Sequence, residues 1–151
     1  MEQQDLELER RVWQRVSGGG KDCAPPTSLR EMEQRSRESA TAFRQLAQVC
    51  SGSMREMLQE LYRQEYGNAM TLMGMRVLSG EEPEKPGSCP WNKTGTCRAL
   101  SLSYRRSVQA RQDYAARAAE GEFAPVFAGM AASEAEKMGK LLALIGMCKG
   151  G

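Results

Sequence analysis

Two long stretches, residues 56–80 and 123–146, place apolar side chains at the three- and four-residue spacing that predicts amphipathic helices. In the middle of each apolar face stands a glutamate, Glu65 in the first and Glu134 in the second. A buried carboxylate is costly unless another group pairs with it or binds it, so these glutamates are the main functional clue. The two faces comprise Met54, Leu58, Leu61, Glu65, Asn68, Leu72 and Met75, and Phe127, Met130, Glu134, Lys137, Leu141 and Leu144.

Capping and turn signals predict where the helices begin and end. A serine followed three residues later by a glutamate is a capping box, and it predicts helix starts at Ser28 and Ser53. The Ser51-Gly52 joint is so short that the helices on either side must be antiparallel neighbours. Residues 81–90 are acidic and proline-rich, which predicts a non-helical crossover. The four expected helices run over residues 28–50, 53–80, 98–119 and 125–147.

The two halves of the chain repeat each other, which indicates the architecture. Ser36, Ser39, Phe43 and Ala47 align at one offset with Ser107, Ala110, Tyr114 and Ala118. Two helical hairpins joined by a long crossover describe an all-α, ferritin-like four-helix bundle. We expect this bundle over residues 28–151. Residues 1–27 are expected to form a short N-terminal amphipathic arm and a linker.

Composition excludes several classes of function. The chain has 21 Lys and Arg against 19 Asp and Glu, so its net charge of +2 indicates neither nucleic-acid nor membrane binding. An acidic N-terminus without an apolar stretch predicts a cytoplasmic protein. The five cysteines are irregularly spaced and predict no disulfide framework. Cys89 and Cys97 are expected to be ordinary thiols of the crossover loop; the alternative is a loop-closing disulfide or redox switch.

Three segments carry a resemblance to a known family. They are the helix containing Tyr104, Ala110 and Tyr114, the run from Pro125 to Lys137, and the run from Leu61 to Gly80. With them the chain resembles the ferritin-like superfamily, specifically the bacterial rubrerythrin-type proteins, over about residues 28–147. The resemblance implies two irons held by two lone glutamates and two Glu-x-x-His motifs. The chemistry it implies is reduction of O₂ or peroxide, or oxidation of iron.

The chain departs from this family at four of the six ligand positions. Glu65 and Glu134 match the glutamates of the Glu-x-x-His motifs, but the chain contains no histidine. An ammonium has no lone pair to donate to a metal. We therefore expect Lys137 to neutralise Glu134 or Glu65 in a buried ionic cluster that replaces the di-iron centre. The histidine positions fall on Asn68 and Lys137, and the lone-glutamate positions fall on Ser36 and Ser107.

The resulting prediction is a non-catalytic helical module without a cofactor, acting as a homo-oligomer or with a protein partner. The alternative is an oxidoreductase that binds Fe or Mn through altered ligands centred on Glu65 and Glu134. A carboxylate and hydroxyl site would suit Mg²⁺ or Mn²⁺, and a shifted register would bring in Glu38. The methionines at 70, 73 and 75 could bind Cu(I), although such a stripe usually serves packing.

Overall fold

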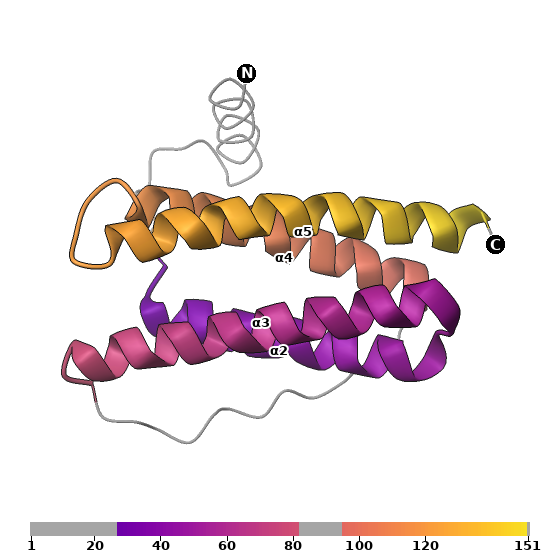
Figure 1. The fold of residues 1–151 in the computed structure, drawn as a ribbon, viewed down its shortest axis with the longest axis horizontal. Coiled ribbons are helices and arrows are strands. Elements are labelled where there is room, and N and C mark those ends of the chain that lie inside the picture. The colour runs from indigo at the N-terminus through magenta and orange to yellow at the C-terminus, as the bar shows by residue number, and fades with distance from the viewer. Residues whose placement is uncertain (1–26, 82–94, 151) are drawn as a thin grey trace.

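The computed structural model describes residues 27–81 and 95–150, which form four helices and no strand (Figure 1). The expected all-α fold is confirmed. The predicted N-terminal arm and most of the crossover lie outside the described residues. The helices are α2 (Leu29–Val49), α3 (Gly52–Leu78), α4 (Thr96–Arg117) and α5 (Ala124–Gly150).

The first predicted helix start is confirmed and the second is wrong. The Ser28 hydroxyl accepts a hydrogen bond from the Glu31 N–H at 3.1 Å, as expected of a capping box. However, α3 begins at Gly52, one residue before Ser53, and its N-cap Ser51 makes no side-chain capping bond. Gly52 has a φ of 63°, a conformation that favours glycine. This residue turns the chain so sharply that α3 starts before the predicted box.

The helices pair as two antiparallel hairpins, α2 with α3 and α4 with α5, and the hairpins pack against each other (Figure 1). The turn of the second hairpin contains Gly121 at a φ of 110°. The apolar core consists of two clusters of buried residues. Phe43, Leu58, Leu61, Leu100, Leu141 and Leu144 belong to one; Met32, Leu72, Met75, Tyr114, Phe127 and Met130 belong to the other.

Candidate functional site

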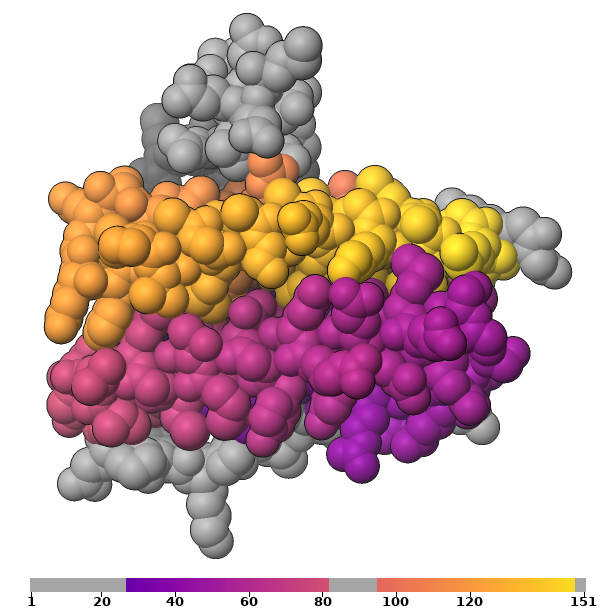
Figure 2. Space-filling view, in the orientation of Figure 1, coloured from indigo at the N-terminus to yellow at the C-terminus, as the bar shows by residue number. Residues whose placement is uncertain are grey.

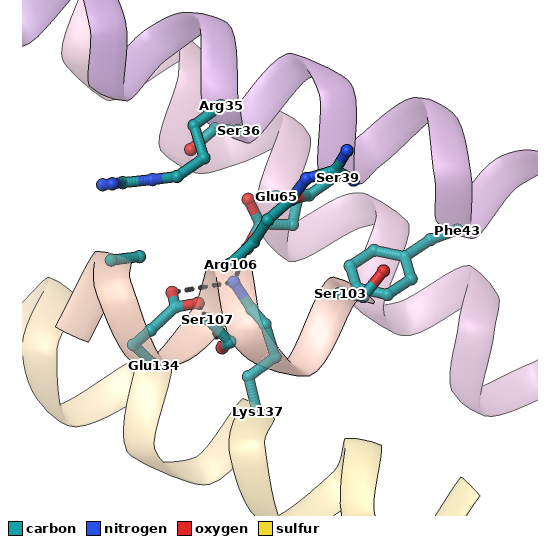
Figure 3. Close-up of a pocket in the computed structure, with 11 residues that line it drawn as sticks. Arg35, Ser36, Ser39, Phe43, Glu65, Ser103, Arg106, Ser107, Glu134 and Lys137 are labelled. Carbon is teal, nitrogen blue, oxygen red and sulfur yellow. Dashed lines mark hydrogen bonds and ion pairs between the residues drawn. The ribbon is translucent and has the colours of Figure 1, made fainter. Parts of the chain in front are cut away.

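A polar pocket at the middle of the bundle receives side chains from all four helices (Figure 3). It contains five of the six residues that fall on metal-ligand positions if the resemblance to ferritin-like proteins holds. Asn68 is the exception: it is half-buried and does not line this pocket. The lining residues are Arg35, Ser36, Ser39 and Phe43 from α2, Glu65 from α3, Ser103, Arg106, Ser107 and Ala110 from α4, and Glu134 and Lys137 from α5.

Lys137 joins the two glutamates. Its ammonium forms ion pairs with Glu65 and with Glu134, the second at 2.8 Å between Nζ and Oε2. The other carboxylate oxygen of Glu134 accepts a hydrogen bond of 2.5 Å from the Ser107 hydroxyl. Only 1% of Lys137 and of Glu134 is exposed, and 4% of Glu65. Both glutamates and Lys137 are therefore inside the molecule, and all three carry partners.

Burial determines the protonation of this cluster. It raises the pKa of Glu134 to about 7, although the Ser107 hydrogen bond and the Arg35 charge oppose the shift. It also lowers the pKa of Lys137, with a smaller lowering contribution from Arg35. One ammonium cannot neutralise two carboxylates. Protonation of Glu134 below about pH 7 removes its negative charge from beside the Lys137 ammonium.

Arg35 lines the pocket and also contacts two residues of α4. It pairs with Asp113 at 2.6 Å and lies over the Tyr114 ring, 5.9 Å from its centroid. The Tyr114 hydroxyl is 3.4 Å from the Ser36 hydroxyl, and burial raises the pKa of this tyrosine. The two aligned serines therefore have different partners. The Ser36 hydroxyl is paired with the Tyr114 hydroxyl, whereas the Ser107 hydroxyl donates to the Glu134 carboxylate.

Sequence reasoning missed the inward position of the arginines. A solvated helix face is the usual location of such residues, but Arg35 and Arg106 both line the pocket. The repeat contained a signal: each arginine directly precedes one of the two aligned serines, Ser36 and Ser107. When a serine faces the core, the residue next to it lies at the edge of that helix face. A long side chain at this edge can reach the centre of the bundle.

A second ionic network between α2 and α3 was also missed. Glu33 is only 6% exposed and accepts from Arg37 at 2.8 Å and from Arg76 at 2.6 Å. Arg76 extends the network to Glu81, again at 2.6 Å. These contacts connect the two helices of one hairpin near the end of α3. They lie outside the polar pocket, and we assign them to packing of the hairpin.

The donor set of the pocket does not fit a di-iron pair. Its side chains leave no room for a water molecule, and α3 and α5 close over it along their lengths on the face shown in Figure 2. Across residues 27–81 and 95–150, no three His, Cys, Asp or Glu side chains gather as a metal-binding group. Glu38, the acidic residue of the alternative register, does not line the pocket and instead accepts from Gln34 at 3.4 Å.

The expectation for Cys97 is wrong. Cys97 lies in the first turn of α4, not in the crossover loop, and forms a disulfide with Cys148 in the last turn of α5. The two Cα atoms are 5.8 Å apart, although 51 residues separate the cysteines in sequence. Sequence spacing gave no signal for this pair, because the pairing requires that opposite ends of an antiparallel hairpin meet. Cys89 lies outside the described residues.

No model of a known protein family matches this chain, and neither curated proteins nor solved structures provide a significant match. Among the described helices, none combines the length and apolar character needed to cross a membrane.

Proposed function

We propose that this protein is a non-catalytic helical module of ferritin-like, rubrerythrin-related origin, in which an internal ammonium occupies the position of the metal ions. The observation that supports this proposal is the contact of the Lys137 ammonium with both Glu65 and Glu134. In a metal-binding bundle of this kind, the glutamates would share divalent or trivalent cations. Here a covalently attached cation supplies the positive charge, and it cannot dissociate.

The physical consequence is a centre without redox or Lewis-acid chemistry. A lysine ammonium has three N–H donors, no lone pair and no accessible oxidation state. It satisfies the carboxylates that would otherwise be costly to bury. What remains for function is the outer surface of the bundle. Exposed apolar side chains lie on both α3 and α5, among them Tyr66 on α3 and Leu142 on α5. These side chains support a role in binding a protein partner or a second copy.

The test is the metal content of protein produced in medium supplemented with iron and manganese. We expect elemental analysis to find less than about one tenth of an equivalent of either metal, because the Lys137 ammonium already pairs with both carboxylates. Near-stoichiometric Fe or Mn that is lost on combined Glu65→Ala and Glu134→Ala substitution would contradict the proposal. Circular dichroism of that double variant distinguishes loss of ligands from loss of fold.

A matched gain-of-function variant makes the negative result informative. Ser36→Glu, Asn68→His, Ser107→Glu and Lys137→His together restore every position of the family pattern that this chain lacks. We expect this fourfold variant to bind iron, because it replaces the ammonium with imidazole, adds a second imidazole and raises the number of carboxylates from two to four. A variant that carries the other three substitutions but keeps Lys137 should not take up iron. Iron bound equally well with Lys137 in place would show that the ammonium does not exclude metals.

The alternative function, an oxidoreductase with altered Fe or Mn ligands, has one supporting observation. Two carboxylates and two hydroxyls, from Glu65, Glu134, Ser36 and Ser107, converge on the pocket from four different helices. Metal binding there would require Lys137 to leave the centre. The same elemental analysis decides between the two functions, because only the alternative predicts metal in the wild-type protein.

A further inference from the structure

The disulfide at one end of the bundle joins two helices at ends of opposite polarity. Cys97 is the second residue of α4, and Cys148 is the third residue from the end of α5. The first-turn N–H groups of a helix carry partial positive charge, and its last-turn carbonyls carry partial negative charge. The two sulfur atoms therefore lie in different electrostatic surroundings, although they form one bond.

The surroundings of Cys97 strengthen this difference. The N-cap of α4 is Gly95, which has no side chain to accept from the first-turn N–H groups, and the first turn contains no acidic residue. The next residue, Arg98, is exposed and positively charged. A thiolate is stabilised at a helix N-terminus and beside an arginine. A cation, Lys149, also follows Cys148 in sequence, so the difference between the two sulfurs comes from the helix ends. Negative charge is favoured on Cys97 at the N-terminus of α4 and disfavoured on Cys148 at the C-terminus of α5.

Both cysteines are half-buried residues, and exchange requires that an external thiol reach the bond between them. In thiol–disulfide exchange the better leaving group departs faster, and the better leaving group is the sulfur whose thiolate is more stable. We propose that Cys97–Cys148 is a directional thiol–disulfide exchange site, at which a dithiol reductant attacks Cys148 and expels Cys97. This site lies at one end of the bundle and is independent of the polar centre and of the function proposed for it.

The exchange balances in two steps. A thiolate of the reductant attacks the Cys148 Sγ, forming a mixed disulfide as the Cys97–Cys148 bond breaks and the electron pair leaves on Cys97 as a thiolate. The second thiol of the reductant, after losing its proton, then attacks the mixed disulfide and releases Cys148 as a thiolate, which takes up a proton. The reductant ends as an intramolecular disulfide, and the protein gains two electrons as two reduced cysteines.

A monothiol has no second thiol with which to resolve the mixed disulfide within one molecule, so brief treatment followed by alkylation captures the first step and its direction. We would use the oxidised full-length protein with Cys23, Cys50 and Cys89 replaced by serine, so that only the pair remains. Brief treatment with glutathione, alkylation with iodoacetamide and tryptic digestion yield separate peptides, residues 94–98 and 141–149. We expect the glutathione adduct on Cys148, with Cys97 alkylated, in roughly threefold or greater excess over the opposite product.

A charge substitution tests the cause. Arg98→Glu places an anion beside Cys97, which makes the departing thiolate less stable. We therefore expect the excess of the Cys148 adduct to fall to about half or less. Arg105→Glu is the control: Arg105 is also an exposed arginine of α4, but it lies beyond the first turn. Equal adducts on the two cysteines, an excess on Cys97, or no disulfide in the air-oxidised protein would each overturn the proposal.

Discussion

Lys137 and Lys140 lie one turn apart on α5, and each forms an ion pair, but their surroundings differ. Lys140 pairs with Glu60 at 3.0 Å while 30% of its side chain is exposed, whereas the Lys137 side chain is 1% exposed. Removing one partner of a buried ionic cluster leaves uncompensated charge inside the protein, which costs about 3–5 kcal/mol. A surface pair contributes about 0–1 kcal/mol. The two lysines therefore form a matched pair for mutation.

We expect Lys137→Met to lower the free energy of unfolding by about 3–5 kcal/mol and Lys140→Met by at most about 1 kcal/mol. Methionine keeps the unbranched length of the side chain while removing its charge, so the comparison isolates the ammonium. Urea unfolding followed by circular dichroism measures both values. Equal losses in the two variants would mean that Glu65 and Glu134 do not depend on Lys137.

The raised pKa of Glu134 predicts how stability depends on pH. The folded-state value, about 7, lies above the ordinary value of 4.5, so the folded protein binds this proton more tightly than the unfolded chain. The stabilisation is complete below about pH 4.5 and is lost as the pH rises to about 7. Relative to Glu134→Gln, which cannot titrate, the wild type should lose on the order of 3 kcal/mol across this range.

Urea titrations across the same pH range compare the two proteins. The charged groups facing Glu134 are Arg35 from α2, Glu65 from α3, Arg106 from α4 and Lys137 from its own helix. Lys137 affects stability over a separate pH range. Its pKa is lowered from 10.5 to about 7 in the folded protein, and the stability contribution of such a group is lost as the pH falls through that range. A constant difference between wild type and Glu134→Gln below neutral pH would show that Glu134 is ionised throughout.

At the scale of the elements, α3 and α5 contain glycines that the fold does not require. A Cβ added at Gly67 or at Gly139 meets nothing within 4 Å, and both glycines lie inside long helices. Glycine in a helix interior costs about 1 kcal/mol relative to alanine. We therefore expect Gly67→Ala and Gly139→Ala each to raise the free energy of unfolding by roughly 0.5–1 kcal/mol.

Gly121 in the α4–α5 turn is the matched control. It also has open space around its Cα, but its φ is 110°, which an alanine rarely adopts. We expect Gly121→Ala to lower the melting temperature, with a loss of about 1 kcal/mol or more. Thermal unfolding of the three variants would separate the two effects. Destabilisation by Gly67→Ala or Gly139→Ala would indicate a role for the bare backbone that the single chain does not explain.

The helices were predictable because their signals are local. The spacing of apolar residues, the Ser28 cap and the proline-rich crossover each depend on residues close together in sequence. The failure at Ser53 is also local, since the N-cap is Ser51, two residues earlier, and is followed by Gly52 with its positive φ. Such a conformation cannot be predicted from a serine and a glutamate at the right spacing alone.

At the scale of the whole molecule, the predictable part of the site is the part that the repeat encodes. Glu65 and Glu134 occupy equivalent positions in the two hairpins. The inward face predicted for one helix therefore supports the inward face predicted for the other. Contacts between hairpins or between distant helix ends have no such signal. The Arg35–Asp113 pair and the Cys97–Cys148 disulfide depend on how the helices are rotated and where they end. Hydrophobic periodicity does not determine these quantities to within the length of a side chain.

The polar layer divides the core, and this arrangement leads to a final prediction. Replacing Glu65 and Glu134 by leucine and Lys137 by methionine would join the two apolar clusters. Replacing a whole buried ionic cluster by apolar residues is often neutral or stabilising, by about 1–4 kcal/mol. We expect the triple variant to unfold at a higher urea concentration than the wild type, in contrast to Lys137→Met alone.

The same variant tests whether the ionic layer specifies the pairing of the hairpins. The two hairpins resemble each other, and an apolar interface tolerates shifts that charged groups at fixed positions do not. We expect broader amide resonances, or hairpin exchange between copies detected by light scattering, in the more stable triple variant. A variant that is more stable, monodisperse and equally well ordered would show that the cluster adds no specificity. A less stable triple variant would show that Lys137 and its glutamates stabilise the fold beyond the cost of burying them.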